Sequence, residues 1–342
     1  MKPETTPTPR IRQRPWFIPL LSGLVVNPTL KVCGIQPGSS PALDFDRAAH
    51  EASVKQLPAS DGRFVSREDL LVPSADGATQ NRARLFRPRA APGAADSAPT
   101  PLVVYAHGGG WCLNTGASQP WDWMCASLAR DLGWSVLSLD YRRAPEHPWP
   151  CAAEDVYAAL AWLGSDASAA RVRADRSRVV LMGESAGGNL AAVAALMWRD
   201  RRPAGVTVAH QVLLSPCVPA RPLRASRVDP ARADGAFLPA WAMAWFEEAY
   251  AGPLGVDALA REPYANPLAA PSLAGLPALT GVVGGAEVLR DEGVEYFAAV
   301  RAAGVDAAWR EWEGGYHAFV IFPFGDAPSA WEYVRDRLRS TV

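Results

Sequence analysis

The sequence predicts an α/β fold in which a mostly parallel central sheet is flanked by helices. The first observation is a set of short, continuous apolar runs, such as 102–106 and 179–182, as expected for strands covered on both faces. The second is that such runs alternate with helical patterns over roughly 200 residues, which indicates βαβ units. The third is a length of 342 residues with 49% hydrophobic side chains, enough to bury a large core.

The predicted elements follow in chain order. An edge hairpin comes first, with strands over 65–72 and 83–86 on either side of a turn-rich stretch at 74–77. The core strands are expected over 102–106, 134–139, 179–182, 210–214, 278–283 and 307–312. Helices are expected over 45–54, 121–132, 152–163, 187–199, 241–250 and 292–302.

Composition narrows the kinds of partner. The formal net charge is −1, with 34 basic and 35 acidic residues, so neither nucleic acid nor an anionic membrane surface is an expected partner. The five cysteines are dispersed without a Cys-x-x-Cys pair, which favours reduced thiols and a cytoplasmic location. Neither they nor the five histidines show metal-ligand spacing. The apolar run at 16–26 is interrupted by prolines and too short to span a bilayer.

The most informative stretch is Gly-Glu-Ser-Ala-Gly-Gly at 183–188, between an apolar run and a helix-forming run. In Gly-x-Ser-x-Gly the glycines allow a sharp strand-to-helix turn that lifts the serine hydroxyl above the sheet. The N–H groups at the start of the following helix favour negative charge at the same point. The pattern predicts that Ser185 is a nucleophile, whereas in an ordinary loop it would be a helix N-cap.

A second glycine run, His107-Gly-Gly-Gly110, follows the predicted strand at 102–106. A site that transfers acyl groups needs backbone N–H donors aimed at the developing oxyanion, and side chains at those positions would block the approach. The alternative is a flexible strand-end loop with a structural histidine. A glycine run at each of two strand ends favours the acyl-transfer interpretation.

Taken together, these motifs resemble the hormone-sensitive-lipase-type branch of the α/β-hydrolases, a family of carboxylic ester hydrolases. The resemblance covers roughly residues 100–320, in the family's order. It rests on H-G-G-G-W at 107–111, D-Y-R-R-A-P-E-H-P-W-P at 140–150, E-D-V-Y-A-A-L-A-W-L at 154–163, G-E-S-A-G-G-N-L-A-A at 183–192, L-R-D-E-G at 289–293 and Y-H-A-F at 316–319.

The resemblance implies an α/β-hydrolase fold with a helical cap. Residues 61–217 and 264–342 would form the catalytic domain. Residues 1–60 would form an N-terminal cap segment, and residues 218–263 an inserted cap or lid. The insertion interrupts the strand–helix alternation, and segments of this length are usually lids or binding elements.

The resemblance also implies roles for individual residues. Ser185 would be the nucleophile and His317 the general base. The oxyanion hole would be formed by the N–H groups of Gly109, Gly110 and Ala186. His107 would brace the glycine loop.

The acid of the site is where the sequence departs from the family pattern. The family usually has Asp-Pro-Leu-Arg-Asp after the penultimate strand, whereas this chain reads Ala286-Glu-Val-Leu-Arg-Asp291. Aligning the shared Leu-Arg-Asp places Glu287 at the catalytic position. Asp291 is the alternative, although a carboxylate there also suits the start of a helix. We expect Glu287 to be the acid.

Other side chains are given structural or pocket roles. Asp140 and Glu146 are expected to pair with Arg142. Glu184, beside the serine, is left as pocket lining or a salt-bridge partner. Aromatic residues near the glycine loop and in the insertion predict a hydrophobic, covered cleft, with Trp111, Trp241 and Trp245 as substrate-pocket residues.

These expectations lead to a serine carboxylesterase that hydrolyses apolar esters of short to medium acyl chain, with a small-molecule ester as its partner and a homodimer as an allowed assembly. No cofactor motif is present, and no cofactor or metal is expected. Two alternatives stay open: an amidase or peptidase with the same triad, and a ligand-binding receptor on this scaffold.

Overall fold

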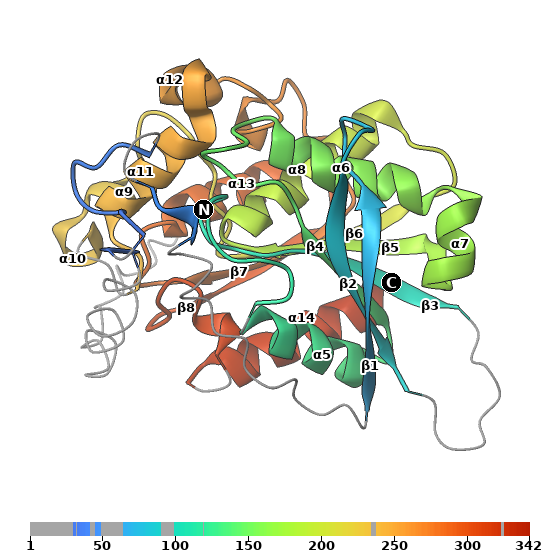
Figure 1. The fold of residues 1–342 in the computed structure, drawn as a ribbon. Helices are drawn as coiled ribbons and strands as arrows, with labels where there is room; N and C mark the ends of the chain where they lie inside the picture. Colours follow the sequence, from blue (N-terminus) through green and yellow to red (C-terminus); the bar gives the residue numbers. More distant parts are fainter. Residues whose placement is uncertain are drawn as a thin grey trace, which may run out of the picture.

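The fold is an eight-stranded, mostly parallel sheet between two layers of helices, as the sequence predicts (Figure 1). The computed structural model describes residues 30–31, 33–41, 45–48, 64–89, 99–118, 120–233, 237–322 and 325–342. The strands lie in the order β1-β2-β4-β3-β5-β6-β7-β8. Strand β2 pairs antiparallel with both β1 and β4, and every pairing from β4 to β8 is parallel.

The strands confirm all the predicted positions. They are β1 (Val65–Pro73), β2 (Gln80–Pro88), β3 (Thr100–Ala106), β4 (Ser135–Asp140), β5 (Ala174–Glu184), β6 (Val208–Leu214), β7 (Ala278–Gly284) and β8 (Ala307–Trp312). Strand β5 is longer than predicted because it begins with polar residues that are not buried, such as Asp175 and Ser177, which hydrogen-bond to each other within the strand.

Helices cover both faces of the sheet. The longer ones are α5 (Trp121–Leu132), α6 (Cys151–Leu163), α8 (Ala186–Arg201), α11 (Ala240–Ala251), α13 (Arg290–Ala302) and α14 (Ala327–Thr341). The short ones are α7 (Asp166–Val172), α9 (Ala225–Val228), α10 (Pro230–Ala233), α12 (Val256–Leu259) and the 3₁₀ turns η2 (Gly252–Leu254), η3 (Pro267–Ala269) and η4 (Phe319–Ile321). Helices α5 and α14 lie on one face, and α6, α8 and α13 lie on the other (Figure 1).

Alternation along the strands supplies a core on each face. In β3, Val103 and Tyr105 face the α5–α14 side, while Leu102 and Val104 face the α6–α8 side. All four side chains are buried. A strand covered on both faces needs apolar residues at every position, which is why these strands appear in the sequence as unbroken apolar runs.

Helix α14 was not predicted. Its fully buried residues, Ala327, Ala330, Val334 and Leu338, recur every three or four positions, so one narrow stripe packs on the sheet while most other positions are polar or charged. Helix α7 was also not predicted. The helix predicted over 45–54 lies largely outside the described residues, as do the apolar run at 16–26 and most of the N-terminal segment 1–60.

The ion pairs expected around Arg142 are wrong. Arg142 pairs with Asp155 of α6 at 2.8 Å and with Asp76 of the β1–β2 turn at 2.7 Å. Glu146 pairs instead with Arg47, at 2.6 Å between Nη2 and Oε2. Tertiary packing places Asp155, which is almost fully buried, nearer to Arg142 than either residue expected from the local sequence.

Residues 218–263, the segment predicted to be an insertion, contain α9 to α12, which gather at one end of the molecule (Figure 1). The helix predicted at 241–250 is confirmed as α11. A buried arginine joins the insertion to α13: Arg227 of α9 contacts Glu247 of α11 at 2.7 Å and Glu292 of α13 at 3.0 Å. Each of these three side chains is nearly inaccessible to solvent.

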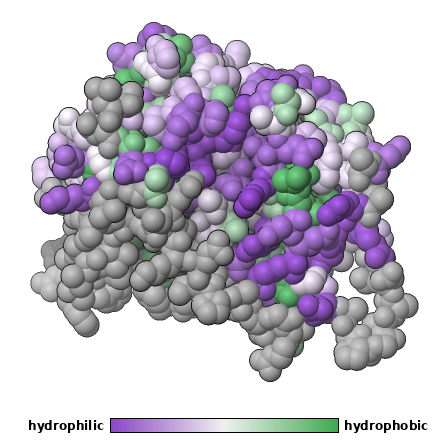
Figure 2. All heavy atoms as spheres, in the orientation of Figure 1, coloured by the Kyte–Doolittle hydropathy of each residue, from purple (hydrophilic) through white to green (hydrophobic). Residues whose placement is uncertain are grey.

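Among the described residues, few large apolar side chains are exposed at the surface. On the face shown in Figure 2, hydrophilic residues dominate and hydrophobic ones form small, separate patches. Among the described residues, no helix combines the length and the apolar character needed to cross a membrane.

Candidate active site

The carboxyl ends of three parallel strands bring Ser185, Glu287 and His317 together. Ser185 follows β5 directly, Glu287 lies in the turn between β7 and α13, and His317 lies in the loop after β8. Parallel strands present their carboxyl ends at one edge of a sheet, so residues far apart in the sequence meet there. All three side chains are buried.

Ser185 occupies a strained turn between β5 and α8. Its φ is 58° and its ψ is −121°, conformations that non-glycine residues rarely adopt. Although it stands at the N-cap position, its side chain makes no capping hydrogen bond. A Cβ on Gly187 would lie 2.0 Å from the carbonyl oxygen of Ala106, so only glycine allows this turn to press against β3.

A chain of hydrogen bonds joins the three side chains. His317 Nδ1 lies 2.7 Å from Glu287 Oε2, and His317 Nε2 lies 2.9 Å from Ser185 Oγ. Since an ionised carboxylate only accepts, Nδ1–H donates to Glu287, which leaves Nε2 to accept from the serine hydroxyl. This is the geometry in which a base can take the proton of an attacking hydroxyl.

The surroundings of Glu287 and Asp291 distinguish the two acids. The second oxygen of Glu287 accepts hydrogen bonds from the Ser215 hydroxyl at 2.9 Å and from the Gly284 N–H at 2.7 Å. Asp291 instead accepts from the Ser226 N–H at 2.8 Å and pairs with Arg290 at 2.7 Å, at the start of α13. The acid in contact with His317 is therefore Glu287.

Electrostatics at His317 balance burial against two carboxyl groups. Burial disfavours the charged imidazole, but the hydrogen bond and charge of Glu287 and the charge of Glu184 outweigh it, so the pKa of His317 is raised. For Glu184 the burial effect wins and raises the pKa to about 7, although His317 and the Trp121 N–H lower it.

The glycine loop stands opposite the serine. His107 Nδ1 contacts the Gly108 carbonyl at 2.8 Å, and the His107 ring stacks on Tyr141, whose hydroxyl donates to the His107 carbonyl at 2.7 Å. These contacts match the bracing role predicted for His107. Gly109 and Gly110 have φ of 118° and 60°, which favour glycine.

The predicted oxyanion donors are three backbone N–H groups at the glycine loop and at the start of helix α8. Within the described part of the chain, the N–H groups of Gly109, Gly110 and Ala186 donate no hydrogen bond to another backbone group. Ala186 opens helix α8, so its N–H lacks a partner within the helix. A Cβ on Gly110 would lie 2.3 Å from the Phe246 ring, which shows that helix α11 packs directly on the glycine loop.

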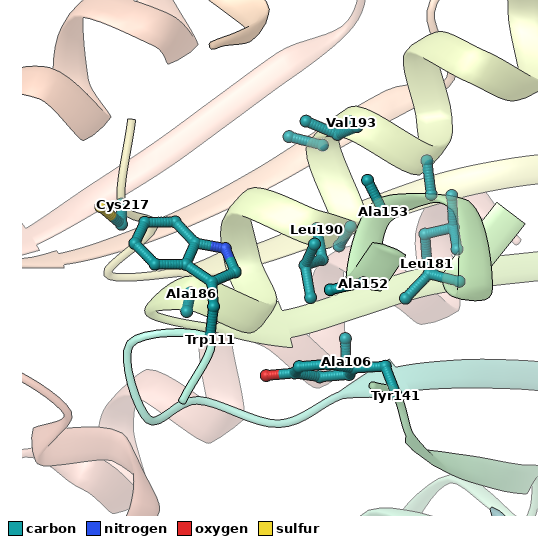
Figure 3. Packing of buried hydrophobic residues seen from close by; sticks show 14 of the residues in the cluster. Ala106, Trp111, Tyr141, Ala152, Ala153, Leu181, Ala186, Leu190, Val193 and Cys217 are labelled. Atoms are coloured by element: carbon teal, nitrogen blue, oxygen red, sulfur yellow. The ribbon is translucent and has the colours of Figure 1, made fainter. Parts of the chain in front are cut away.

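The predicted pocket residues occupy different environments. Trp111 is fully buried and stacks on Tyr250 of α11, with ring centroids 4.4 Å apart. Figure 3 shows Trp111 and Ala186 within one apolar cluster, although Trp111 follows the glycine loop and Ala186 opens helix α8. Trp245 is buried beside Phe246, and Trp241 is half-buried.

Two further polar residues lie at the site: Ser215, which the sequence did not single out, and Glu184, which was left as pocket lining or a salt-bridge partner. Ser215 follows strand β6, and its hydroxyl donates a hydrogen bond to Glu287. The sequence feature that could have indicated it is a polar residue directly after a buried strand. Glu184 lies 3.6 Å from His317 Nε2, and its signal was the position next to the nucleophile. Among the described residues, no group of three or more His, Cys, Asp or Glu side chains is arranged to hold a metal ion.

A buried serine, histidine and carboxylate at the carboxyl edge of a parallel sheet define an α/β hydrolase. Residues 103–321 match the family model described as the alpha/beta hydrolase fold, and the chain belongs to this family, in its hormone-sensitive-lipase-type branch of carboxylic ester hydrolases. It is accordingly a carboxylic ester hydrolase.

Known relatives agree with this family assignment. The chain is 34% identical to the carboxylic ester hydrolase LipN of Mycobacterium tuberculosis over 329 residues, covering 91% of this chain and 81% of the relative. An esterase structure from Pyrobaculum calidifontis matches with a TM-score of 0.71 at 35% identity, over 80% of this chain and 85% of that one. An ester hydrolase from the metagenome of Lake Arreo matches with a TM-score of 0.77 at 28% identity, over 95% and 98% of the two chains.

Proposed function

We propose that the protein hydrolyses carboxylic esters by a serine mechanism, with Ser185 as nucleophile, His317 as general base and Glu287 as the acid that orients it. The observation that carries the proposal is the unbroken hydrogen-bonded chain from Ser185 through His317 to Glu287. Each link is within hydrogen-bonding reach before any substrate arrives.

In the acylation step, Ser185 Oγ attacks the ester carbonyl while its proton moves to His317 Nε2. The carbonyl oxygen becomes an oxyanion, for which the N–H groups of Gly109, Gly110 and Ala186 are the proposed donors. His317 then gives the proton to the departing alcohol oxygen as the carbon–oxygen bond breaks. Glu287 stays ionised and stabilises the imidazolium.

In the deacylation step, His317 takes a proton from water as the water oxygen attacks the acyl carbon. The second tetrahedral intermediate collapses, the bond from carbon to Ser185 Oγ breaks, and the serine recovers its proton from His317. Water therefore supplies the hydroxyl group of the acid product, and no other reagent is consumed.

For the substrate we propose apolar esters of short to medium acyl chain. We assign Trp111, Trp241 and Trp245 to the walls of the site, because Trp111 directly follows the glycine loop and the other two lie on α11, which packs on that loop. We also propose that residues 1–60 and 218–263 form the cap over the catalytic domain, residues 61–217 and 264–342. The homodimer and the cytoplasmic location stay predictions.

The test is a graded series of p-nitrophenyl esters, run beside the matching anilides, with wild type and Ser185→Ala. We expect ester turnover by the wild type, with kcat highest for short to medium acyl chains. The alanine variant should lose at least about 10⁴-fold in kcat, because the group that forms the acyl-enzyme is gone. Mass spectrometry after a rapid quench should show the acyl group on Ser185.

Each alternative has its own outcome in that assay. Hydrolysis of the anilides in preference to the esters would replace the esterase proposal with an amidase. Saturable binding of an ester without turnover would favour a receptor. Undiminished turnover by Ser185→Ala would remove the serine mechanism altogether.

A further inference from the structure

A second buried carboxyl group lies beside the catalytic histidine. Glu184 Oε1 is 3.6 Å from His317 Nε2, the nitrogen that also faces Ser185. Glu287 contacts the opposite nitrogen, Nδ1. The imidazole is therefore flanked by a carboxyl group on each side, and the mechanism above uses only one of them.

The space around Glu184 is built to hold a carboxyl group. Its Oε2 accepts a hydrogen bond from the indole N–H of Trp121 at 3.4 Å. A Cβ on Gly108 would lie 1.9 Å from the same oxygen, so glycine at this position leaves room that the carboxyl group fills. The glycine loop, α5 and the nucleophile turn thus enclose Glu184 together, and only 2% of its surface is exposed.

The charged and titratable groups that face this pair come from several elements. Glu287 and Arg227 act on His317 besides Glu184, the first favouring and the second opposing its protonation. Around Glu184 lie His317 and Glu287, and the buried hydroxyls of Tyr105 on β3 and Tyr141 after β4 also feel its charge. Arg227 is the one cation acting on the imidazole among these groups, and it is bound to Glu247 and Glu292.

We propose that Glu184 is a positioning residue for His317, which steadies the imidazole from the Ser185 side and sets the acid limit of activity. This inference rests on the proposed serine mechanism. Once Ser185 is acylated its oxygen has no proton to donate to Nε2, so Glu184 is the side chain that still faces that nitrogen. A negative charge this close in a buried site favours the protonated imidazole strongly.

The sign of the effect follows from which form of His317 is active. Attack requires neutral His317, so activity falls as pH drops through the pKa of the imidazole. Ionised Glu184 favours the protonated ring and therefore moves that fall to higher pH. Replacing Glu184 with glutamine keeps the shape and removes the charge, so the fall should move to lower pH.

The experiment measures kcat/KM against pH for a p-nitrophenyl ester with wild type, Glu184→Gln and Trp121→Phe. We expect Glu184→Gln to shift the acid limb of the kcat/KM profile to lower pH by about one unit. At pH values below the limb, kcat/KM expressed as a fraction of each enzyme's maximum should then be roughly tenfold higher in Glu184→Gln than in wild type. Trp121→Phe keeps the carboxyl group but removes its donor, which leaves Glu184 less ionised. A smaller shift in the same direction is expected.

A control variant separates this effect from burial in general. Glu292 is as deeply buried as Glu184 but is paired with Arg227 rather than with His317. Because Glu292 partly offsets the charge of Arg227, which also acts on His317, Glu292→Gln should shift the acid limb clearly less than Glu184→Gln does, even if it lowers stability. Equal shifts in Glu184→Gln and Glu292→Gln would overturn the proposal.

A second readout does not depend on turnover. The downfield proton NMR signal from the bond between His317 and Glu287 can be titrated in the free enzyme, and its midpoint should fall in Glu184→Gln and, less, in Trp121→Phe. An unchanged midpoint in both variants would refute the role of Glu184. Failure of the serine mechanism would appear separately, as activity that survives Ser185→Ala.

Discussion

At the scale of single residues, Glu287 is held at both oxygens. One oxygen accepts from His317, and the other accepts from Ser215 and from the N–H of Gly284. A carboxylate with several donors has little freedom to rotate, which keeps the imidazole in one tautomer and one orientation. Asp291, four positions further along, instead accepts a hydrogen bond from the Ser226 N–H and forms an ion pair with Arg290.

This difference predicts opposite outcomes for two conservative substitutions. Glu287→Gln should lower kcat by about 10³- to 10⁴-fold, because an amide can favour the wrong histidine tautomer and cannot stabilise the imidazolium. Asp291→Asn should change kcat by less than about tenfold and act mainly on thermal stability. Steady-state kinetics and thermal melts of both variants test the assignment, and it fails if Asp291→Asn is the inactive one.

Residues also show where inference from the sequence stops. Ser185, His317 and the glycines were predictable because short local patterns fix their backbone setting. The partners of Arg142 and Glu146 were not. Whether Arg142 pairs with Asp140 or with Asp155 depends on how α6 packs beside the loop after β4. The residues next to Arg142 in the sequence do not indicate that packing.

At the scale of elements, a buried histidine links strand β6 to the last helix. His210 Nε2 contacts the Thr280 hydroxyl of β7 at 2.8 Å, and Nδ1 contacts the Thr341 hydroxyl of α14 at 3.0 Å. Burial lowers the pKa of His210 to about 4, and the charge of Arg337 adds to this effect while Asp306 opposes it. The histidine is thus neutral in the folded protein at neutral pH.

The lowered pKa predicts that acid weakens this link. Unfolded histidine titrates near 6.5, so the stability that neutral His210 provides is complete above that pH and is lost as pH falls toward 4. Between pH 7 and 4.5, His210→Gln should lose roughly 1–3 kcal/mol less of its free energy of unfolding than wild type does. Urea unfolding at both pH values measures this, and His147→Gln, at an exposed histidine, is the control. Equal losses in wild type and His210→Gln would contradict it.

The elements themselves were largely predictable, for a physical reason. Strands such as β3 and β7 are buried on both faces and read as continuous apolar runs, while α6 and α13 show a helical period. Helix α14 was missed because its buried stripe is narrow and its other positions are polar. The length of β2 was underestimated because the residues at both of its ends are mostly polar and are not buried, so they add nothing to an apolar run.

At the scale of the whole molecule, the insertion is tied to the hydrolase body by charge as well as by apolar packing. Arg227 forms ion pairs with Glu247 of α11 and with Glu292 of α13, and all three side chains are almost fully buried. Burial of a charge is costly unless it is paired, so this contact holds only with all its members present. Through α11 it also fixes Phe246 against Gly110.

Removing Arg227 alone should therefore lower the stability of the fold more than removing Arg227 together with the charges of Glu247 and Glu292. Arg227→Met leaves Glu292 buried without its cation and should cost about 3–5 kcal/mol in the free energy of unfolding. The triple variant Arg227→Met, Glu247→Gln, Glu292→Gln should recover most of that loss, because the one charge it leaves without its carboxylate, Arg221, is partly exposed to water. Urea unfolding at pH 8 gives the comparison, and a triple variant as unstable as the single one would count against the charge argument. The single variant should be less affected at pH 5, where a buried carboxyl can bind a proton.

The arginine contact also limits how new specificities can be engineered into this enzyme. A chimera that receives residues 218–263 from another esterase would keep Glu292 but lose its counter-ion, Arg227, unless the incoming segment has an arginine at the same place. The graft would also need a ring where Phe246 meets Gly110, since that ring fills the space above the glycine. Successful transplants should therefore supply an arginine at position 227 and an aromatic ring at position 246, which match Glu292 and Gly110 of the recipient.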